Sequence, residues 1–393
     1  MAIKADKELN IAMFGHKRIP SREGGIEVVV AELSARMAAL GHRVTCFNRG
    51  GHHVSGSEFD ASTADMYRDV KLKTVWTVDR RGLAAMTASF SAAFHAAFGK
   101  YDVVHIHAEG PAFMCWLPRM MGKRVIVTIH GLDWARAKWG KFASWYIRSG
   151  EKNAARFADE IIVLSPGVQE YFQKTYGRAT VFIPNGVVKA QRREAREIRK
   201  RWGLEADSYV LFLGRIVPEK GIHYLIEAWK HIKTDKKLVI AGGSSDTQEY
   251  MNRLKALAGD GVIFTGFQQG QILEELYSNA YIYVLPSDLE GMPLSLLEAM
   301  SFGNCCLVSS IPECTQVVEN HAAVFEKGNV EDLQKVLQNL IDRPEAVSRY
   351  KAGAADYICR KYNWEDVVSR TIGLYRAHKA AMAQPEPRNE SVV

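Results

Sequence analysis

The residue types best suited to chemistry lie in Ser287–Gly303 (SDLEGMPLSLLEAMSFG). Glu290 precedes a Gly-Met-Pro turn, and Glu298 follows eight residues later in a helix expected to begin near Pro293, since proline is favoured in a first helical turn. Carboxylates accept hydrogen bonds from hydroxyl groups, and the backbone N–H groups at a helix start hold anions. The segment therefore predicts a site for a phosphorylated polyol. In the alternative interpretation Glu290 only caps the helix and Glu298 is exposed, although its apolar neighbours make that a costly place for an idle charge.

A second candidate segment is Gly214–Gly221 (GRIVPEKG), which directly follows an expected strand. It places Arg215 and Lys220 at the carboxyl end of that strand, where open α/β sheets bind ligands. Arginine offers a planar fork of donors and lysine a point charge, a combination suited to a diphosphate. Taken alone, the two residues are also compatible with surface cations beside a turn.

The first half of the chain contributes two further candidates. Gly24 and Gly25, in Ile19–Glu27 (IPSREGGIE), join the first expected strand to a helix, so a ligand phosphate could approach the backbone closely. The pattern matches neither of the usual nucleotide-binding glycine motifs, and a structural tight turn explains it equally well. His130, in Thr128–Asp133 (TIHGLD), stands at a strand end beside a glycine and is expected to face the same cleft.

We expect no metal site and no cofactor. His105 and His107 alternate along one strand without a third ligand, so they are interpreted as core or cleft lining. No D-x-D motif is present, and the nearest pattern is Asp288-Leu289-Glu290. A departing diphosphate would therefore have to be neutralised by Arg215 and Lys220.

Residues 133–157 combine aromatic and basic side chains. Such a mixture is typical of a helix that lies on an anionic membrane. Stacking on nucleic acid and an ordinary helix with buried tryptophans are the alternatives. The residues concerned are Trp134, Trp139, Trp145 and Tyr146 with Arg136, Lys138, Lys141 and Arg148.

Composition narrows the class of protein. The chain has 393 residues, of which 47% are hydrophobic and 24% charged, values typical of a globular protein of about two domains. Its beginning resembles no secretory signal and no run of ~20 apolar residues occurs, so a cytoplasmic protein is expected, including at the inner face of the cell membrane. The six cysteines lack metal-ligand spacing.

The two halves of the chain differ in charge. Residues 1–190 contain 26 Lys and Arg against 17 Asp and Glu, whereas residues 191–393 contain 25 against 27. The basic first half therefore predicts an anionic partner.

Short Val- and Ile-rich runs alternate with helical stretches throughout. In the first half strands are expected at 10–14, 43–47, 71–76, 103–107, 124–129 and 160–164, with a helix over 27–40. After a turn and a highly charged stretch the alternation restarts, with strands at 209–213, 237–241, 262–265, 281–285 and 305–308. This order predicts an α/β protein with two doubly wound domains facing a central cleft. We place the domains at 1–188 and 189–363, with a disordered tail at 384–393.

Taken in order, G-G-x-E, T-x-H-G, G-R-x-x-x-E-K-G and E-x7-E resemble the family 4 retaining glycosyltransferases of the GT-B fold. The resemblance extends from Ile11 to about Tyr375. Segments such as YGRATVFIPNGV look like the bacterial enzymes that build capsular and cell-wall polysaccharides, including rhamnosyltransferases. Those enzymes more often read G-S-R-G-I-P where this chain has Gly15-His16-Lys17-Arg18-Ile19-Pro20.

The resemblance implies a nucleotide-sugar donor, metal independence and a role for each candidate residue. Arg215 and Lys220 would neutralise the diphosphate, and Glu298 would bind the ribose. Glu290 and His130 would contact the transferred sugar. Backbone atoms would line the sugar and phosphates at Gly24, Gly25, Gly291, Met292, Pro293 and Leu294. A last helix, at about 364–382, would cross back to the first domain.

The expected reaction is transfer of a hexosyl or rhamnosyl group with retention of configuration. The acceptor hydroxyl would attack from the face that the diphosphate leaves, and it would belong to a glycan or a lipid-linked glycan. The other expected partner is an anionic membrane at the periphery, and no nucleic acid is expected. Two alternatives remain at this point: a nucleotide-sugar epimerase of the same architecture, and a non-catalytic scaffold that binds carbohydrate or membrane.

Overall fold

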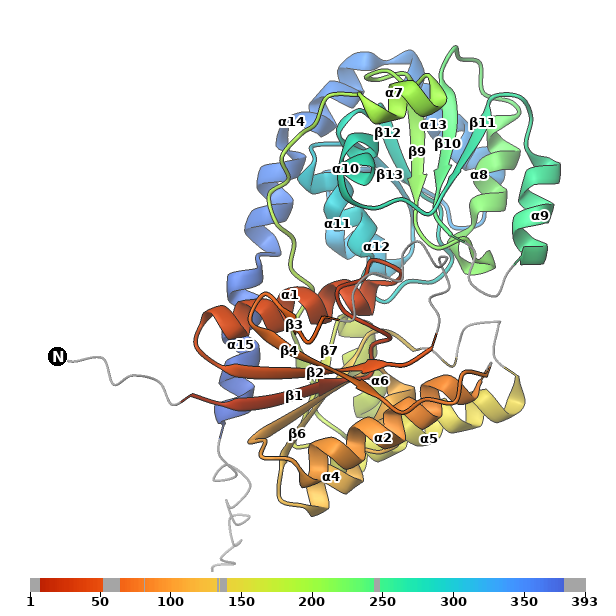
Figure 1. Cartoon of the computed structure of the whole chain (residues 1–393). Coiled ribbons are helices and arrows are strands. Elements are labelled where there is room, and N and C mark those ends of the chain that lie inside the picture. Colours follow the sequence, from red (N-terminus) through yellow and green to blue (C-terminus); the bar gives the residue numbers. More distant parts are fainter. Residues whose placement is uncertain are drawn as a thin grey trace, which may run out of the picture.

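The computed structural model describes residues 8–51, 64–80, 82–132, 134, 140–243 and 248–377. It contains two separate sheets, each covered by helices, which lie one above the other in Figure 1. The expected tail at 384–393 lies outside the described residues. Within the described residues, no helix is both long and apolar enough to cross a membrane.

The first sheet has eight strands in the order β3-β4-β2-β1-β5-β6-β7-β8. All neighbours are parallel except β3 and β4, which pair antiparallel. The strands are β1 (Asn10–Phe14), β2 (Arg43–Arg49), β3 (Met66–Tyr67), β4 (Val70–Val75), β5 (Val103–His107), β6 (Arg124–Ile129), β7 (Glu160–Val163) and β8 (Val181–Phe182).

Alternating side chains of these strands fill two cores, one on each face of the sheet. Ile11 and Met13 pack with α1 (Gly25–Ala39) and α15 (Trp364–Arg376) on one face. Ala12 and Phe14 point to the other face. That face is covered by α2 (Leu83–Phe98), α3 (Glu109–Ala112), α4 (Trp116–Met120), α5 (Lys141–Phe157) and α6 (Pro166–Tyr176).

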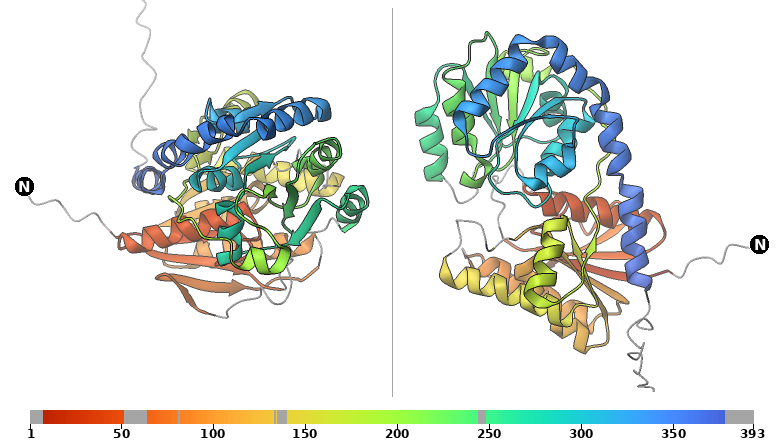
Figure 2. Two further views of the ribbon diagram at one scale, coloured as in Figure 1. Left: turned by 90° about the horizontal axis from the view of Figure 1, so that it is seen from above. Right: turned by 180° about the vertical axis from the view of Figure 1, so that it is seen from behind.

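The second sheet has six parallel strands in the order β11-β10-β9-β12-β13-β14. They are β9 (Tyr209–Leu213), β10 (Lys237–Ala241), β11 (Val262–Gly266), β12 (Ile282–Leu285), β13 (Cys305–Ser309) and β14 (Ala323–Phe325). Helices lie on both faces, as the two views of Figure 2 also show. They are α7 (Glu197–Trp202), α8 (Ile222–Trp229), α9 (Gln248–Leu257), α10 (Gly270–Ser278), α11 (Leu294–Ser301), α12 (Pro312–Val318), α13 (Val330–Asp342) and α14 (Pro344–Lys361).

The predicted fold class is confirmed, and every predicted strand is present within two residues of its expected ends. The prediction missed β3, β8 and β14, which are only two or three residues long. Strands this short carry no readable alternation, because a period of two needs several residues to appear. They are formed by their neighbours in the sheet rather than by their own sequence.

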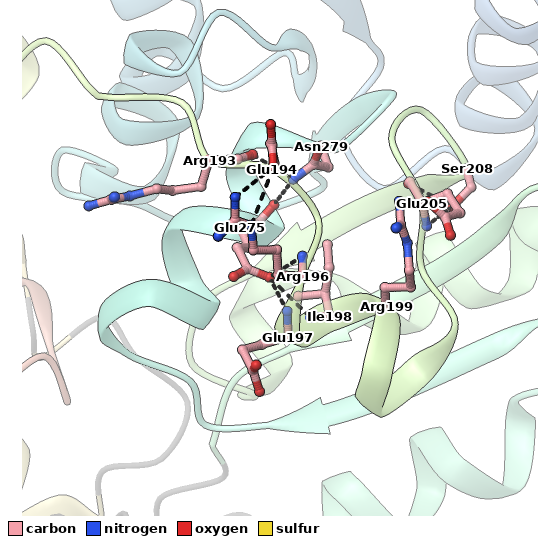
Figure 3. A network of polar contacts seen from close by, with 10 residues as sticks. All are labelled: Arg193, Glu194, Arg196, Glu197, Ile198, Arg199, Glu205, Ser208, Glu275 and Asn279. Carbon is pink, nitrogen blue, oxygen red and sulfur yellow. Dashed lines mark hydrogen bonds and ion pairs between the residues drawn. The ribbon is translucent and has the colours of Figure 1, made fainter.

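The charged stretch after β8 leads the chain from the first sheet to the second. Residues 183–196 contain no strand apart from the single bridge between Val187 and Asn363, and the proposed boundary at 188 lies within this connection. Glu275 of α10 is buried and accepts hydrogen bonds from the backbone N–H groups of Arg196, Glu197 and Ile198 at 2.7 to 3.1 Å (Figure 3). A carboxylate of α10 thus satisfies the free N–H groups at the start of α7 and fixes where the chain enters the second sheet.

The chain returns to the first sheet at its end. Helix α14 runs along the side of the molecule from the second sheet toward the first, and α15 continues beside α1 (Figures 1 and 2). Trp364, the first residue of α15, is buried in the core of the first sheet. A Cβ atom at Gly186 would lie 2.5 Å from its ring, so this crossing packs directly on the connection between the sheets. The part of the expected helix beyond Ala377 lies outside the described residues.

Candidate active site

A large cavity of about 940 Å³ is lined by residues of both sheets at the carboxyl ends of their strands. All eleven candidate site residues line it. They are Gly24, Gly25, His130, Arg215, Lys220, Glu290, Gly291, Met292, Pro293, Leu294 and Glu298. Gly24 and Glu298, which are 274 positions apart in the sequence, therefore meet in one space, because the carboxyl ends of the strands in the two sheets face each other.

Lys220 and Glu290 form a nearly buried ion pair on the side of the second sheet. The Lys220 Nζ lies 2.6 Å from Glu290 Oε1, and the two side chains are 12% and 8% exposed. The Ser287 hydroxyl donates to the same carboxylate oxygen at 2.6 Å. Arg215 also lines this part of the cavity. The region thus combines two cations with one carboxylate that has spare acceptor capacity for a hydroxyl group.

The backbone holds these two loops together. Lys220 ends a short 3₁₀ turn (Pro218–Lys220) after β9, and Gly221 follows it with φ of +64°. A Cβ atom at Gly221 would lie 2.0 Å from the carbonyl oxygen of Pro286, at the end of β12. The N–H of Asp288 donates to the carbonyl oxygen of Glu219 at 2.9 Å. The close approach of the two loops therefore depends on a glycine, and it sets the distance between Lys220 and Glu290.

Glu298 lies on α11 and is shared by two partners. The Tyr277 hydroxyl donates to Glu298 Oε2 at 3.2 Å, and the Arg22 guanidinium pairs with Oε1 from the loop of the first sheet. Burial, with Glu298 adding to it, raises the pKa of Tyr277 well above 10, so this phenol remains a donor. Because α11 begins after Pro293, Glu290 does not cap this helix.

Sequence reasoning missed Arg22, Tyr277 and Ser287. Arg22 stands two residues before the Gly24–Gly25 pair, so its position in a loop of the cleft could have been predicted. Its partner Glu298 lies 276 residues away, and local sequence carries no signal for that contact. Ser287 lies three residues before Glu290, a spacing that could have suggested their hydrogen bond. Tyr277 carries no local signal, because it reaches Glu298 from a different helix, α10.

The two sheets touch through backbone at Gly131 and Gly291. A Cβ atom at Gly291 would lie 1.7 Å from the carbonyl oxygen of His130, and one at Gly131 would lie 3.2 Å from the Cα of Gly291. Nearby, the Asn185 N–H lies 3.0 Å from the Met292 sulfur, and a Cβ at Gly25 would lie 3.3 Å from Leu294. Small residues thus allow the turn of the second sheet to pack directly against the loops of the first.

Three histidines connect the cavity wall to the core of the first sheet. His130 Nε2 lies 3.1 Å from His107 Nδ1, and the His107 ring centroid is 4.1 Å from that of His105. His105 contacts the Thr128 hydroxyl at 2.7 Å and the Tyr375 hydroxyl of α15 at 2.6 Å. Burial, with His130 adding to it, lowers the pKa of His105 to about 3, and burial lowers that of His107 well below 6.5. These two imidazoles are therefore neutral at physiological pH.

The described residues contain no group of three or more His, Cys, Asp or Glu side chains placed to hold a metal ion. Among the described residues, the lysine and arginine side chains that line the cavity are Lys17, Arg22, Arg49, Arg215 and Lys220.

The aromatic and basic segment at 133–157 divides into two parts. The Trp134 indole donates to the buried carboxylate of Glu151, and Arg148 lies over its ring at 4.1 Å. Phe142 and Trp145, in contrast, are 65% and 59% exposed on α5. Thus not all the tryptophans are buried. Arg136, Lys138 and Trp139 lie outside the described residues.

Helices α2 and α5 contribute apolar and small side chains to the cavity wall: Leu83, Ala85, Met86, Ala88 and Ala92 of α2, and Phe142, Ala143, Tyr146 and Ile147 of α5. The first sheet also contributes the charged residues Lys17, Arg22, Glu23, Glu27 and Arg49. Charged side chains therefore line the cavity on both sides, and α2 and α5 add an apolar part of the wall.

Comparison with known proteins agrees with this geometry. The family model described as "Glycosyltransferase Family 4" matches residues 23–191, and "Glycosyl transferases group 1" matches residues 194–356. An uncharacterized glycosyltransferase (MJ1607) of Methanocaldococcus jannaschii is 28% identical over 309 residues, covering 70% of this chain and 75% of that protein. The D-inositol 3-phosphate glycosyltransferase of Xylanimonas cellulosilytica is 25% identical over 384 residues, covering 90% and 91%. HepE of Anabaena, solved with UDP and glucose, superposes with a TM-score of 0.78 at 15% identity, covering 93% and 99%.

The two family models together account for most of the chain, one on each sheet, and the superposition establishes the GT-B fold. The chain belongs to the family 4 (group 1) glycosyltransferases.

Proposed function

We propose that this retaining glycosyltransferase moves a sugar, a hexose or rhamnose, from a nucleotide-sugar to a hydroxyl of a glycan or lipid-linked glycan. The product would be a bacterial surface polysaccharide, assembled at the cytoplasmic face of the cell membrane. The observation that carries the proposal is the buried Lys220–Glu290 pair, which shares one cavity with Arg215 and Glu298. Two cations beside two carboxylates suit a ligand that is a diphosphate at its centre and a polyol at both ends.

Each end of such a donor has a matching group. The diphosphate lies at Arg215 and Lys220, at the carboxyl ends of the strands where α/β sheets bind nucleotides. The backbone of Gly24 and Gly25 faces it from the start of α1. The sugar lies between Glu290 and His130, and the ribose hydroxyls donate to Glu298. The fold of HepE, solved with UDP and glucose, supports this placement by analogy.

The reaction then needs no protein nucleophile. The bond between the anomeric carbon and the β-phosphate oxygen lengthens, while Arg215 and Lys220 stabilise the charge that develops on the diphosphate. The acceptor oxygen attacks the anomeric carbon from the same face, and its proton passes to the departing phosphate oxygen. A glycoside and a nucleoside diphosphate result. Catalysis is electrostatic stabilisation combined with positioning.

Arg22 has to change partner when the donor binds. Its guanidinium pairs with the same Glu298 carboxylate that would accept the ribose hydroxyls. Because the loop that carries Arg22 also carries Gly24 and Gly25, release of Glu298 frees a cation at the phosphate side of the cavity. The donor's ribose would thus replace an ion pair that spans the two sheets.

The first experiment is a thermal-shift screen of the purified protein against UDP-, GDP-, ADP- and dTDP-sugars without added metal. We expect one nucleotide to raise the melting temperature, and the shift to disappear in Glu298→Ala. Glu331→Ala, an exposed carboxylate on α13, is the matched control and should retain the shift. A shift that persists unchanged in Glu298→Ala would contradict the donor assignment.

Turnover separates transfer from the alternative chemistry. A glycosyltransferase releases nucleoside diphosphate in proportion to added acceptor. An epimerase of the same architecture converts the donor without any acceptor, and that result would overturn the proposal.

A further inference from the structure

Helix α2 has an unusual surface for a helix of a globular protein. Its sixteen residues, LAAMTASFSAAFHAAF, include no Asp, Glu, Lys or Arg. Its buried face is made of small residues, chiefly alanines, whereas Phe90, Phe94 and Phe98 are 57%, 53% and 57% exposed. The rings of Phe94 and Phe98 are 4.6 Å apart, so the stripe is continuous along the helix. Large apolar side chains that gather on an uncharged outer face mark an interaction surface rather than scattered exposure.

Helix α5, on the same side of the first sheet, carries a second group of exposed rings. Both helices cover the same side of the first sheet and lie together at the end of the molecule away from the second sheet (Figures 1 and 2). On α5, Phe142 and Trp145 are exposed with ring centroids 5.8 Å apart. We call this the α2–α5 face and define it by Phe90, Phe94, Phe98, Phe142 and Trp145.

Exposed cations border this face. They are Lys100, after the end of α2, and Lys141, Arg148 and Lys152 on α5. On a helical wheel the three α5 residues share the side of Phe142 and Trp145. Within residues 83–124 and 141–157 the acidic residues are Asp102, Glu109 and Glu151, and the two glutamates are fully buried. The face therefore combines insertable aromatic rings with a positive border.

We propose that the α2–α5 face docks on the surface of an anionic lipid bilayer, with α2 as the element that enters the boundary between headgroups and acyl chains. Aromatic rings partition into this boundary, and each nearby cation adds attraction to anionic headgroups. A second copy of the chain fits less well, because a symmetric dimer through this face would oppose its positive border to itself. The positive border of this face therefore favours an anionic bilayer over a second copy of the chain as its partner.

The same two helices also contribute apolar side chains to the wall of the cavity. Leu83 and Phe142, at the starts of α2 and α5, line the cavity and are also 43% and 65% exposed, so docking through this face places that part of the cavity wall next to the lipid. An acceptor with a hydrocarbon chain could then present its glycan at His130 without leaving the bilayer. This part of the inference rests on the proposed function, whereas the docking itself does not.

Sedimentation of the full chain with vesicles tests the proposal. Vesicles of phosphatidylglycerol and phosphatidylcholine are compared with vesicles of phosphatidylcholine alone. We expect wild-type protein to bind the anionic vesicles, and Phe94→Ser with Phe98→Ser to bind at least tenfold more weakly. Leu40→Ser, a 63% exposed apolar residue beyond the end of α1, should bind within twofold of wild type. Equal binding by the double variant, or no binding by wild type, would overturn the proposal.

Two further measurements distinguish the alternatives. Lys141→Glu with Lys152→Glu should reduce binding to anionic vesicles by about tenfold and make the remaining binding less sensitive to salt. Sedimentation velocity without lipid should give the same oligomeric state for wild type and the phenylalanine variant. A dimer that dissociates in this variant would instead assign the face to contacts between copies. The thermal shift with nucleotide-sugars is recorded on each variant, so loss of docking with donor binding intact leaves the proposed chemistry standing.

Discussion

The two sides of the central cavity differ in the side chains that they present. On the side of the second sheet, charged groups are already paired and aligned: Lys220 with Glu290, and Tyr277 with Glu298. On the side of the first sheet, the wall combines the charged residues Lys17, Arg22, Glu23, Glu27 and Arg49 with apolar side chains of α2 and α5. The difference teaches that the second-sheet side can stabilise developing charge with groups already held in place, whereas the part of the wall formed by α2 and α5 offers an apolar surface to a partner.

The largest expected effect concerns the second-sheet side of the cavity, at the Lys220–Glu290 pair. Lys220→Ala removes the cation that would stabilise the departing diphosphate, and it leaves Glu290 without its ion-pair partner. We expect kcat to fall ~10²–10³-fold, as for the loss of an oxyanion donor. Lys230→Ala removes an exposed cation that pairs with Glu227 at 2.8 Å on α8, and it should leave kcat within twofold. Steady-state kinetics of nucleoside diphosphate release measure both, and an unchanged kcat in Lys220→Ala would refute the assignment.

The next largest effect concerns the backbone contact between the two sheets at Gly291. In Gly291→Ala the new methyl group would overlap the carbonyl oxygen of His130, so the turn and the first sheet must move apart. A displacement near 1 Å in the reacting geometry predicts a loss of about 10–100-fold in kcat/KM. The control is Gly353→Ala on α14, where a Cβ meets nothing within 4 Å. If both variants kept wild-type kcat/KM, the contact at Gly291 would not set the site geometry.

The buried histidines of the first sheet predict a pH dependence of stability. The pKa of His105 is about 3 when folded and near 6.5 when unfolded, so below pH 6.5 the unfolded chain takes up a proton that the folded chain does not. The free energy of unfolding therefore falls as pH drops from 6.5 toward 3, by about 2 kcal/mol at pH 5 from this group. Urea unfolding at pH 7.5 and pH 5 should show a smaller fall in His105→Gln. Parallel falls in the two proteins would exclude His105 as the source.

The smallest expected effect concerns the hydrogen bond from Tyr277 to Glu298, on the second-sheet side of the cavity. Tyr277→Phe removes one hydrogen bond to Glu298 and leaves the carboxylate in place. We expect the KM for the donor to rise about 3–10-fold, equivalent to about 1 kcal/mol, with kcat nearly constant, because ribose binding is the same in ground and transition states. A fall in kcat with constant KM would instead assign Tyr277 to the chemical step.

Most strands of the fold could be predicted from local sequence patterns. The strands of both sheets are runs of Val, Ile and Leu bounded by turn residues, so their positions were readable, and their alternation with helices requires parallel sheets. The short strands β3, β8 and β14 escaped because sheet neighbours define them. Most of the candidate residues stand near a strand end or a helix start, whereas Glu298 lies within α11.

Contacts between segments distant in the sequence could not be predicted from the sequence. Arg22 meets Glu298, and Tyr375 of α15 meets His105, only because the chain crosses between the two sheets. The exposed phenylalanines of α2 were also missed, since a run rich in alanine and phenylalanine looks like a buried helix until one knows which face the sheet covers.

The sequence by itself determined the order of strands and helices, the loops that carry chemistry and the excess of positive charge in the first half. Periodicity and turn residues are local properties, so they survive without a structure. Only the tertiary structure decided which loops share one cavity, which carboxylate meets which cation and which side of α2 faces solvent. These depend on long-range packing, where the relative placement of two sheets brings together residues whose sequence separation conceals their contact.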